Sequence, residues 1–280
     1  KYSLLLFALI VTLNSQIKFD ADFESGNIKS VSTTDSVNYS VTTISDIGGR
    51  WFYFRITGVE DKFIKVSIPT TDFSRAMYSY NNKDYHRFTA EETPSYASFQ
   101  KTFEKDTVYV SYYTPYNYSY LQERIDEWKN NSLVVYSELG RTDRDFPIQE
   151  LKITDPFVPD NEKYKVWIHA RTHPSETPSS WQFEGIVETL LKDDPVIDYY
   201  RKNIVFYLIP FTNPEGVYYG RSRTNFDGVD VESNWNKSDD ETTTEVKILK
   251  QRMLELLVID TFDVFLNLHS QAASFCTFWI

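Results

Sequence analysis

The sequence predicts an α/β fold that is preceded by an antiparallel β-sandwich. Up to about residue 115 the chain consists of short aromatic and β-branched runs between turn residues, and longer apolar runs then alternate with helical segments. The chain has 280 residues, of which 41% are hydrophobic and 25% charged, as is typical of a globular protein. We expect the sandwich at residues 17–115 and the α/β domain at residues 116–280.

Short strands are expected to build the first domain. Residues 51–56, 63–68 and 107–112 are rich in aromatic and β-branched side chains, which favour extended structure. Turn signals such as Gly48 and Gly49, and the polar stretch 80–84, separate such runs. Several short strands at this spacing are typical of a small antiparallel sandwich.

The second domain alternates strands with helices. Its strands are expected at residues 165–170, 204–210 and 264–269, each a nearly continuous apolar run. Strands that are apolar on both faces are typical of a mixed, mostly parallel sheet with helices on both sides, in an α/β/α arrangement.

Helices are expected at residues 118–130, 178–192 and 244–259, where apolar residues recur at helical spacing. Ser119 is the expected cap of the first helix. Thr177 is the expected N-cap of the second, with Pro178 at the first helical position, because hydroxyl side chains and proline are favoured there.

The N-terminus resembles a secretory signal segment. Lys1 precedes an apolar run at residues 4–13, which is too short to span a bilayer. We therefore expect a signal peptide at residues 1–16, a secreted or extracytoplasmic protein, and no transmembrane segment. A buried first strand is the alternative interpretation of the same run.

Charge and cysteine content exclude several classes of function. The net charge is −11 and the sequence has no basic patch, which argues against a nucleic-acid partner. Cys276 is the only cysteine, so neither an intrachain disulfide nor a cysteine-based metal cluster can form. A metal would have to be held by histidines and carboxylates.

The four histidines therefore define the search for a metal site. His173 and Glu176 follow one predicted strand and His269 ends another, and in open α/β sheets functional groups gather at the carboxyl ends of the strands. Two histidines and one carboxylate form a typical ligand set for catalytic zinc. His169 lies inside a strand and is expected to be packed or to contact a ligand residue, with a role as a metal ligand as the alternative. His86 is expected at the surface.

A second polar segment follows the strand at 204–210. Asn213 to Gly216 stand at the same predicted rim, and Arg221 and Arg223 come next. An arginine there could bind a carboxylate or stabilise an oxyanion. Two solvated loop arginines would give the same spacing, so both interpretations stay open.

Together these segments resemble the M14 zinc metallocarboxypeptidases, and most closely the branch of the cytosolic carboxypeptidases and their bacterial relatives. The stretch 169–181 is similar to the zinc motif of that branch, 210–217 to its Asn-Pro-Asp-Gly segment and 266–270 to its third-ligand strand. Residues 22–27 and 113–119 are similar to its N-terminal β domain. The resemblance covers nearly the whole chain after residue 16.

The resemblance implies one zinc ion, held by His173, Glu176 and His269, that activates a water and polarises the carbonyl to be cleaved. It further implies a glutamate as general base and a peptide or protein substrate. Arg223 would stabilise the developing oxyanion, so it is the candidate catalytic and substrate-binding arginine. In the family an Asn-Arg pair holds the terminal carboxylate of the substrate.

The sequence departs from the family pattern in two places. Glu232 and Ser233 occupy the positions of the Asn-Arg pair, and an acidic group there would repel a terminal carboxylate. These two residues are therefore candidate substrate-binding residues for an atypical terminus, such as an amidated, branched or cationic one. The catalytic glutamate of the family lies well beyond the third ligand, whereas residues 270–280 contain no acidic residue.

From this we expect an α/β domain that is truncated at its C-terminus and lacks the general base, either as a fragment of a longer enzyme or as an inactive relative. Residues 276–280 resemble an interrupted strand, which favours a fragment. The leading hypothesis is zinc-dependent peptide hydrolysis of the metallocarboxypeptidase type. The alternatives are a non-catalytic member of the fold that binds peptides or serves as a structural subunit, and a metal-free α/β domain with an adhesive sandwich.

Overall fold

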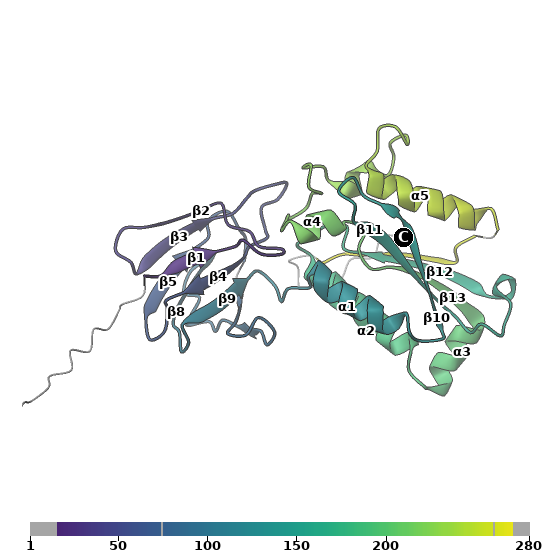
Figure 1. The fold of residues 1–280 in the computed structure, drawn as a ribbon, viewed down its shortest axis with the longest axis horizontal. Helices are drawn as coiled ribbons and strands as arrows, with labels where there is room; N and C mark the ends of the chain where they lie inside the picture. Colours follow the sequence, from purple (N-terminus) through teal and green to yellow (C-terminus); the bar gives the residue numbers. More distant parts are fainter. Residues whose placement is uncertain (1–15, 74, 260, 271–280) are drawn as a thin grey trace, which may run out of the picture.

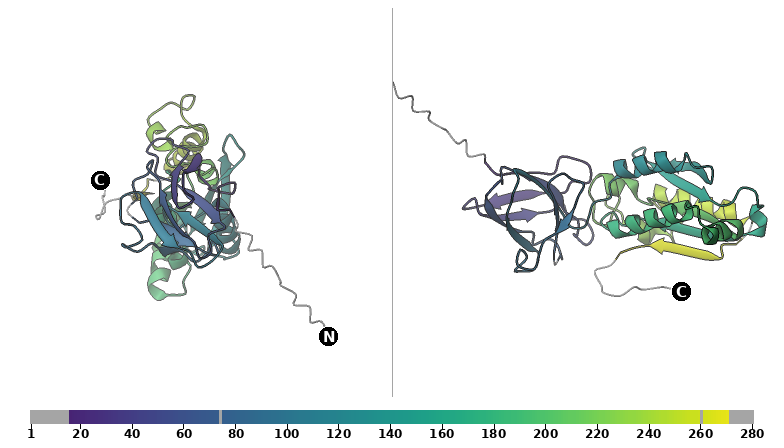
Figure 2. Two further views of the ribbon diagram at one scale, coloured as in Figure 1. Left: turned by 90° about the vertical axis from the view of Figure 1, so that its left-hand side faces the viewer. Right: turned by 90° about the horizontal axis from the view of Figure 1, so that it is seen from below.

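A computed structural model of the chain describes residues 16–73, 75–259 and 261–270. It contains two domains that lie side by side, and views at right angles show the same arrangement (Figures 1 and 2). The predicted signal peptide, apart from its last residue, lies outside the described residues, as do Cys276 and the expected strand at 276–280. Every helix among the described residues is too short or too polar to cross a bilayer.

The N-terminal domain packs two sheets against each other. The first sheet is fully antiparallel and has the order β1 (Lys18–Asp20), β4 (Tyr53–Thr57), β9 (Thr107–Ser111), β6 (Met77–Ser79) and β7 (His86–Arg87). The second has the order β2 (Ser30–Thr33), β3 (Asn38–Thr42), β5 (Phe63–Ser67) and β8 (Ser98–Thr102).

The predicted antiparallel sandwich is confirmed, with one exception. Strands β3 and β5 pair in parallel, because the intervening β4 lies in the other sheet and the chain returns in the same direction. The interior follows from alternation along each strand. In β5, Ile64 and Val66 are buried while Phe63 and Lys65 are exposed, and Phe54 of the facing sheet is fully buried.

The C-terminal domain contains one mixed sheet. Its order is β10 (Val134–Arg141), β11 (Pro147–Ile153), β13 (Ile204–Ile209), β12 (Tyr164–Ala170) and β14 (Val264–Leu268). β12 is parallel to both β13 and β14, whereas β10 and β11 form an antiparallel hairpin that pairs with β13. This confirms the predicted α/β fold with a mixed sheet.

Helices cover both faces of this sheet (Figure 1). On one face Leu121 and Phe183, from α1 (Tyr118–Trp128) and α2 (Thr177–Leu190), pack on sheet residues such as Ile168. On the other face Leu249, from α5 (Thr244–Leu257), packs with Trp167. The remaining helical segments are α3 (Pro195–Asn203), α4 (Pro214–Tyr218), η1 (Asp160–Glu162) and η2 (Val231–Asn234).

Two predicted helix caps were wrong. Asn117, not Ser119, is the N-cap of α1, and the amide and hydroxyl of Ser119 instead donate to the carboxylate of Glu24 in the sandwich. Glu176, not Thr177, is the N-cap of α2, and Thr177 is already helical. Local preference for hydroxyl caps misled in both cases, and for Ser119 a contact distant in sequence determines where the side chain points.

Candidate metal and active site

The candidate metal ligands meet at one rim of the mixed sheet. His173 lies on the turn after β12 and His269 directly follows β14, the parallel neighbour of β12. Glu176 precedes α2 on the same turn as His173. One ligand atom from each of these residues lies within 4.8 Å of the others. We call these three residues the metal cluster.

The carboxylate of Glu176 lies between the two imidazoles. Its Oε1 is 3.0 Å from His173 Nδ1, and its Oε2 is 2.9 Å from His269 Nδ1. The amide of Ser270 also donates to Oε2, at 2.8 Å. The two Nδ1 atoms and the carboxylate therefore converge on one point. Such a set of two imidazoles and one carboxylate fits zinc and leaves coordination positions for water and substrate.

The distal nitrogens of both histidines face carboxylates from the η2 turn. His173 Nε2 is 3.5 Å from Asp230 Oδ1, and His269 Nε2 is 3.4 Å from Glu232 Oε2. The side-chain amide of Asn267 donates to both oxygens of Glu232, at 3.2 and 3.0 Å. A carboxylate in this place orients a ligating imidazole and makes it a stronger ligand.

Electrostatics in the cluster favour positive charge. Burial alone would raise the pKa of Glu176, but hydrogen bonds with His173 and His269 outweigh it and bring the pKa to about 2. Burial alone would lower the pKa of His269, yet its bonds with Glu176 and Glu232 raise it to about 9. A site that stabilises a charged imidazole to this extent also favours a metal cation in the same position.

His169 and His86 lie outside the cluster. His169 is buried in β12, where its Nδ1 accepts a hydrogen bond from Trp167 Nε1 at 2.9 Å. Burial lowers the pKa of His169 to about 4, so the ring is neutral at physiological pH. His86 is exposed on β7. Both placements agree with the sequence analysis.

Arg171 braces the turn that carries His173, and the sequence analysis missed it. Its backbone is in the left-handed region, with φ of 59°, and its side chain is buried. The guanidinium donates to the carbonyl oxygens of Pro174 at 2.7 Å and Tyr116 at 3.1 Å, and to Ser180 Oγ at 2.9 Å. A buried arginine with several acceptors holds a turn rigidly, but an isolated arginine in the sequence gives no signal for this role.

A cleft of about 460 Å³ adjoins the metal cluster and lies between the two domains. The α/β domain lines it with His173, Ser175, Glu176, Ser222 and Arg223. The sandwich contributes the rest of the lining, namely Ile47, Gly48, Arg50, Pro69, Thr70, Thr71 and Asp72. A molecule bound beside the cluster would therefore contact both domains.

The structure distinguishes the two arginines that spacing left open. Arg223 lines the cleft, its side chain is 40% exposed, and its Nε donates to Asp230 Oδ2 at 2.7 Å. Asp230 thus connects Arg223 to His173. Arg221 instead donates to the carbonyl of Phe226 at 2.9 Å and lies over its ring. Ser233 lies outside the cleft lining and donates its hydroxyl to the backbone of Asp230 at 2.9 Å.

Gly216 separates the metal turn from the loop that carries Arg223. A Cβ atom at this position would lie 2.4 Å from Pro174 Cγ and 2.4 Å from the carbonyl oxygen of Thr224. Asn213 closes the same turn, accepting from the Gly216 amide at 2.9 Å and donating to the carbonyl of Thr172 at 3.2 Å. Only glycine fits between the ring of Pro174 and the backbone of Thr224.

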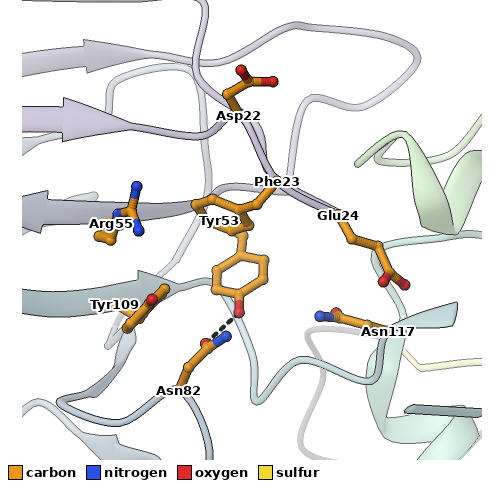
Figure 3. A pocket seen from close by; sticks show the side chains of 8 residues that line it. All are labelled: Asp22, Phe23, Glu24, Tyr53, Arg55, Asn82, Tyr109 and Asn117. Carbon is orange, nitrogen blue, oxygen red and sulfur yellow. Dashed lines mark hydrogen bonds between the residues drawn. The ribbon is translucent and has the colours of Figure 1, made fainter. Parts of the chain in front are cut away.

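A second pocket, of about 280 Å³, lies on the sandwich where it meets the start of α1 (Figure 3). It is lined by Asp22, Phe23, Glu24, Tyr53, Arg55, Asn82, Tyr109 and Asn117. It shares no lining residue with the cleft, and the hydroxyl of Tyr53 is bonded to Asn82. This pocket is therefore separate from the cleft beside the metal cluster.

Comparison with known families assigns both domains. Residues 117–279 match the zinc carboxypeptidase family, and residues 19–113 match the cytosolic carboxypeptidase N-terminal domain. The chain belongs to the zinc carboxypeptidase family, peptidase M14. The predicted resemblance is thereby confirmed, including its branch. The family is zinc-dependent, and its chemistry is the hydrolysis of peptides.

Among the relatives of this zinc carboxypeptidase chain is mouse (Mus musculus) cytosolic carboxypeptidase 6, which is 28% identical over 250 residues and aligns with 78% of this chain. An uncharacterised protein of Zymomonas mobilis is 25% identical over 261 residues, 89% of this chain and 67% of its own length. The chain spans about half the length of cytosolic carboxypeptidase 6 from mouse and human, 46% and 49%.

Among solved structures, the metallo-carboxypeptidase of Burkholderia cenocepacia is similar throughout. The two share 26% identity with a TM-score of 0.79, and the match covers 91% of this chain and 71% of the other. A match over 91% of this chain includes both domains.

Membership of this branch corrects one prediction. The characterised relatives that match are cytosolic carboxypeptidases, and residues 19–113 match the N-terminal domain of that group. The prediction of a secreted or extracytoplasmic protein with a signal segment was therefore wrong. One lysine before about ten apolar residues is a weak signal, because a buried strand or helix can contain the same short apolar run.

Proposed function

We propose that this chain is the zinc-binding, catalytic part of a peptidase that acts near the end of a peptide or protein chain. The observation that carries the proposal is the convergence of His173, Glu176 and His269 within 4.8 Å beside an open cleft. This donor set suits one zinc ion. The zinc ion, when bound, supplies a Lewis acid and a water with a lowered pKa.

Arg223 would serve as the electrophilic residue of the reaction. Its guanidinium lines the cleft next to the cluster, where it can donate to a substrate carbonyl as negative charge develops on the oxygen. The hydrogen bond from Nε to Asp230 fixes one side of the guanidinium, so the group is already oriented before a substrate binds. Arg223 would thus contact both the ground state and the oxyanion.

The substrate terminus would be atypical. Burial alone raises the pKa of Glu232, but hydrogen bonds with His269 and Asn267 lower it overall, so the group is a carboxylate at neutral pH. A free terminal carboxylate docking here would meet like charge. We therefore propose an amidated, branched or cationic terminus near Glu232, with Ser233 at the edge of the binding region. Residues 17–115 and 116–280 would act as the two halves of one substrate site.

A second candidate, peptide binding without turnover, is favoured by one observation. Among the described residues that line the cleft, the carboxylates are Glu176 and Asp72. Glu176 belongs to the cluster, and Asp72 is paired with Arg50 at 2.9 Å and accepts from Tyr112 at 2.7 Å. Neither is placed to take a proton from a water at the cluster.

Metal analysis of the purified chain, combined with peptide hydrolysis assays, tests the proposal. We expect one zinc per chain, loss of that zinc in His173→Ala, and no loss in the matched control His86→Ala, whose ring is exposed. Peptides ending in a free carboxylate, an amide or a branched residue would define the terminus. Absence of zinc from the unsubstituted chain would overturn the proposal, and zinc without turnover would favour the second candidate.

A further inference from the structure

A carboxylate of the sandwich domain holds the backbone on both sides of Arg223. Asp46, in the loop between β3 and β4, accepts hydrogen bonds at Oδ2 from the amides of Ser222 at 3.0 Å, Arg223 at 3.0 Å and Thr224 at 3.1 Å. The hydroxyl of Thr224 donates to the same oxygen at 3.0 Å. We call residues 222–224 the arginine segment.

Three successive amides that converge on one oxygen form an anion-binding nest. Hydrogen bonds to a charged acceptor are about twice as strong as those between neutral groups, so this contact fixes the segment firmly. Ser222 is held from two further sides. Its hydroxyl accepts from the amide of Trp51 at 2.8 Å, and its carbonyl accepts from the amide of Ser175 at 3.0 Å. The segment is thus fixed between the sandwich and the metal turn.

Besides the bond from Trp51 to Ser222, further contacts join the domains outside the arginine segment. Glu24 accepts from the amide of Ser119 at 2.8 Å and so joins the sandwich to the start of α1. Asn27 donates to the carbonyl of Gly220 at 2.7 Å, and Ser25 donates to that of Val217 at 2.8 Å. These bonds hold the domains together, whereas Asp46 binds the amide of Arg223 itself.

We propose that Asp46 is a positioning residue for the reaction. By fixing the arginine segment, it holds the guanidinium of Arg223 in the cleft, so that the sandwich domain determines whether the site of the α/β domain is competent. This inference rests on the proposed role of Arg223. Displacement of a catalytic group by about 1 Å can lower a rate by about 100-fold, so a contact with no substrate of its own can control turnover.

Hydrogen exchange and kinetics of the full chain test this proposal. In Asp46→Gly we expect the amides of 222–224 to exchange at least about tenfold faster, because their shared acceptor is lost. Zinc content should stay the same, and kcat should fall about 10- to 100-fold while KM changes far less. Asp46→Asn keeps the shape and a neutral acceptor, so it should fold and show a smaller loss. Glu24→Gln is the matched control and should leave exchange at 222–224 unchanged.

Formate provides a readout that a purely structural role would not move. The nest left empty in Asp46→Gly can accept a small carboxylate, so formate, with chloride at equal ionic strength as control, should restore amide protection and part of kcat. Unchanged exchange at 222–224 in both Asp46 variants, or a fall in kcat that formate does not reverse, would overturn the proposal. If the unsubstituted chain hydrolyses none of the peptides, the proposed function fails, and the exchange and formate results alone decide whether Asp46 holds the segment.

Discussion

The two domains contribute to the cleft in different ways. The α/β domain supplies all three candidate metal ligands, His173, Glu176 and His269, from segments that end or follow parallel strands. The sandwich supplies lining residues and Asp46, whose contacts run to the backbone of the other domain. The candidate metal ligands therefore come from the α/β domain, and the sandwich helps to position the segments of that domain that line the cleft.

The difference follows from how each architecture is built. Adjacent parallel strands place the residues after their carboxyl ends close together, so a sheet edge can assemble ligands from distant parts of the sequence. Loops of an antiparallel sandwich have no such common edge, but they project far enough to hold a neighbouring segment. The predictions below change residues of the α/β domain, whereas the Asp46 variants change the sandwich.

The largest effect is expected for Glu176→Gln. Glu176 accepts hydrogen bonds from both imidazoles and from the amide of Ser270, and it is the only carboxylate of the cluster. Its neutral replacement should abolish stoichiometric zinc binding, as measured by metal analysis after dialysis. Glu184→Gln on the same helix is the matched control, because Glu184 pairs with Arg124 instead. Zinc retained in Glu176→Gln would mean that the α/β domain does not hold the metal as described.

Arg223→Ala should be next in size. Loss of one preorganised donor to an oxyanion lowers kcat by about 100- to 1,000-fold, and zinc content should be unaffected. The control is Arg221→Ala, since Arg221 faces Phe226 rather than the cleft. Steady-state kinetics on the best peptide substrate measure both. Equal losses of kcat in the two variants would show that Arg223 has no role in the cleft that Arg221 lacks.

His169 should make the stability of the chain depend on pH. Its pKa is about 4 in the folded chain and about 6.5 when unfolded, so between these values the unfolded state binds more protons. The stabilisation is complete above pH 6.5 and is lost as the pH falls to 4. The loss amounts to about 3 kcal/mol in the free energy of unfolding.

Urea unfolding of the metal-free chain across this pH range measures the effect. His169→Asn keeps an acceptor for Trp167 and cannot titrate, so its stability should fall less steeply over the same interval. If the free energy of unfolding fell equally with pH in the two proteins, His169 would not be the group whose protonation destabilises the fold.

The smallest effect is expected for Glu232→Gln. An orienting carboxylate behind a metal ligand contributes about 10- to 100-fold to metal affinity, so zinc should bind more weakly by that factor. Competition with a chromophoric chelator gives the dissociation constant. Ser233→Ala in the same turn is the control, since its hydroxyl bonds only to the backbone of Asp230 among the described residues. An unchanged affinity would leave substrate binding as the remaining role of Glu232.

Much of the α/β domain could be predicted from sequence because its strands are continuous apolar runs. The expected strands at 165–170, 204–210 and 264–269 correspond to β12, β13 and β14 within one residue. The hairpin of β10 and β11 was not predicted. β10 is only partly buried, β11 buries the polar residues Gln149 and Glu150 among its apolar ones, and the connecting loop, 142–146, contains neither glycine nor proline.

The site could be predicted only where topology determines it. Parallel neighbours imply that residues following β12 and β14 meet, so His173 and His269 could be paired in advance. The positions of Arg171 and Asp46 could not. Asp46 precedes two glycines, as in an ordinary surface turn, and its partners lie 176 to 178 residues away in sequence. No local pattern records such a contact.

Gly216 has a consequence for how the site can vary. Pro174 in the metal turn and the carbonyl of Thr224 approach this residue so closely that only a hydrogen atom fits at the Cβ position between them. Any side chain at 216 would act as a spacer, and it would move the ligand His173 and the arginine segment apart together. The distance from the metal cluster to Arg223 is therefore set by the smallest residue in the chain, and variation among related chains should change the flanking residues while this gap stays closed.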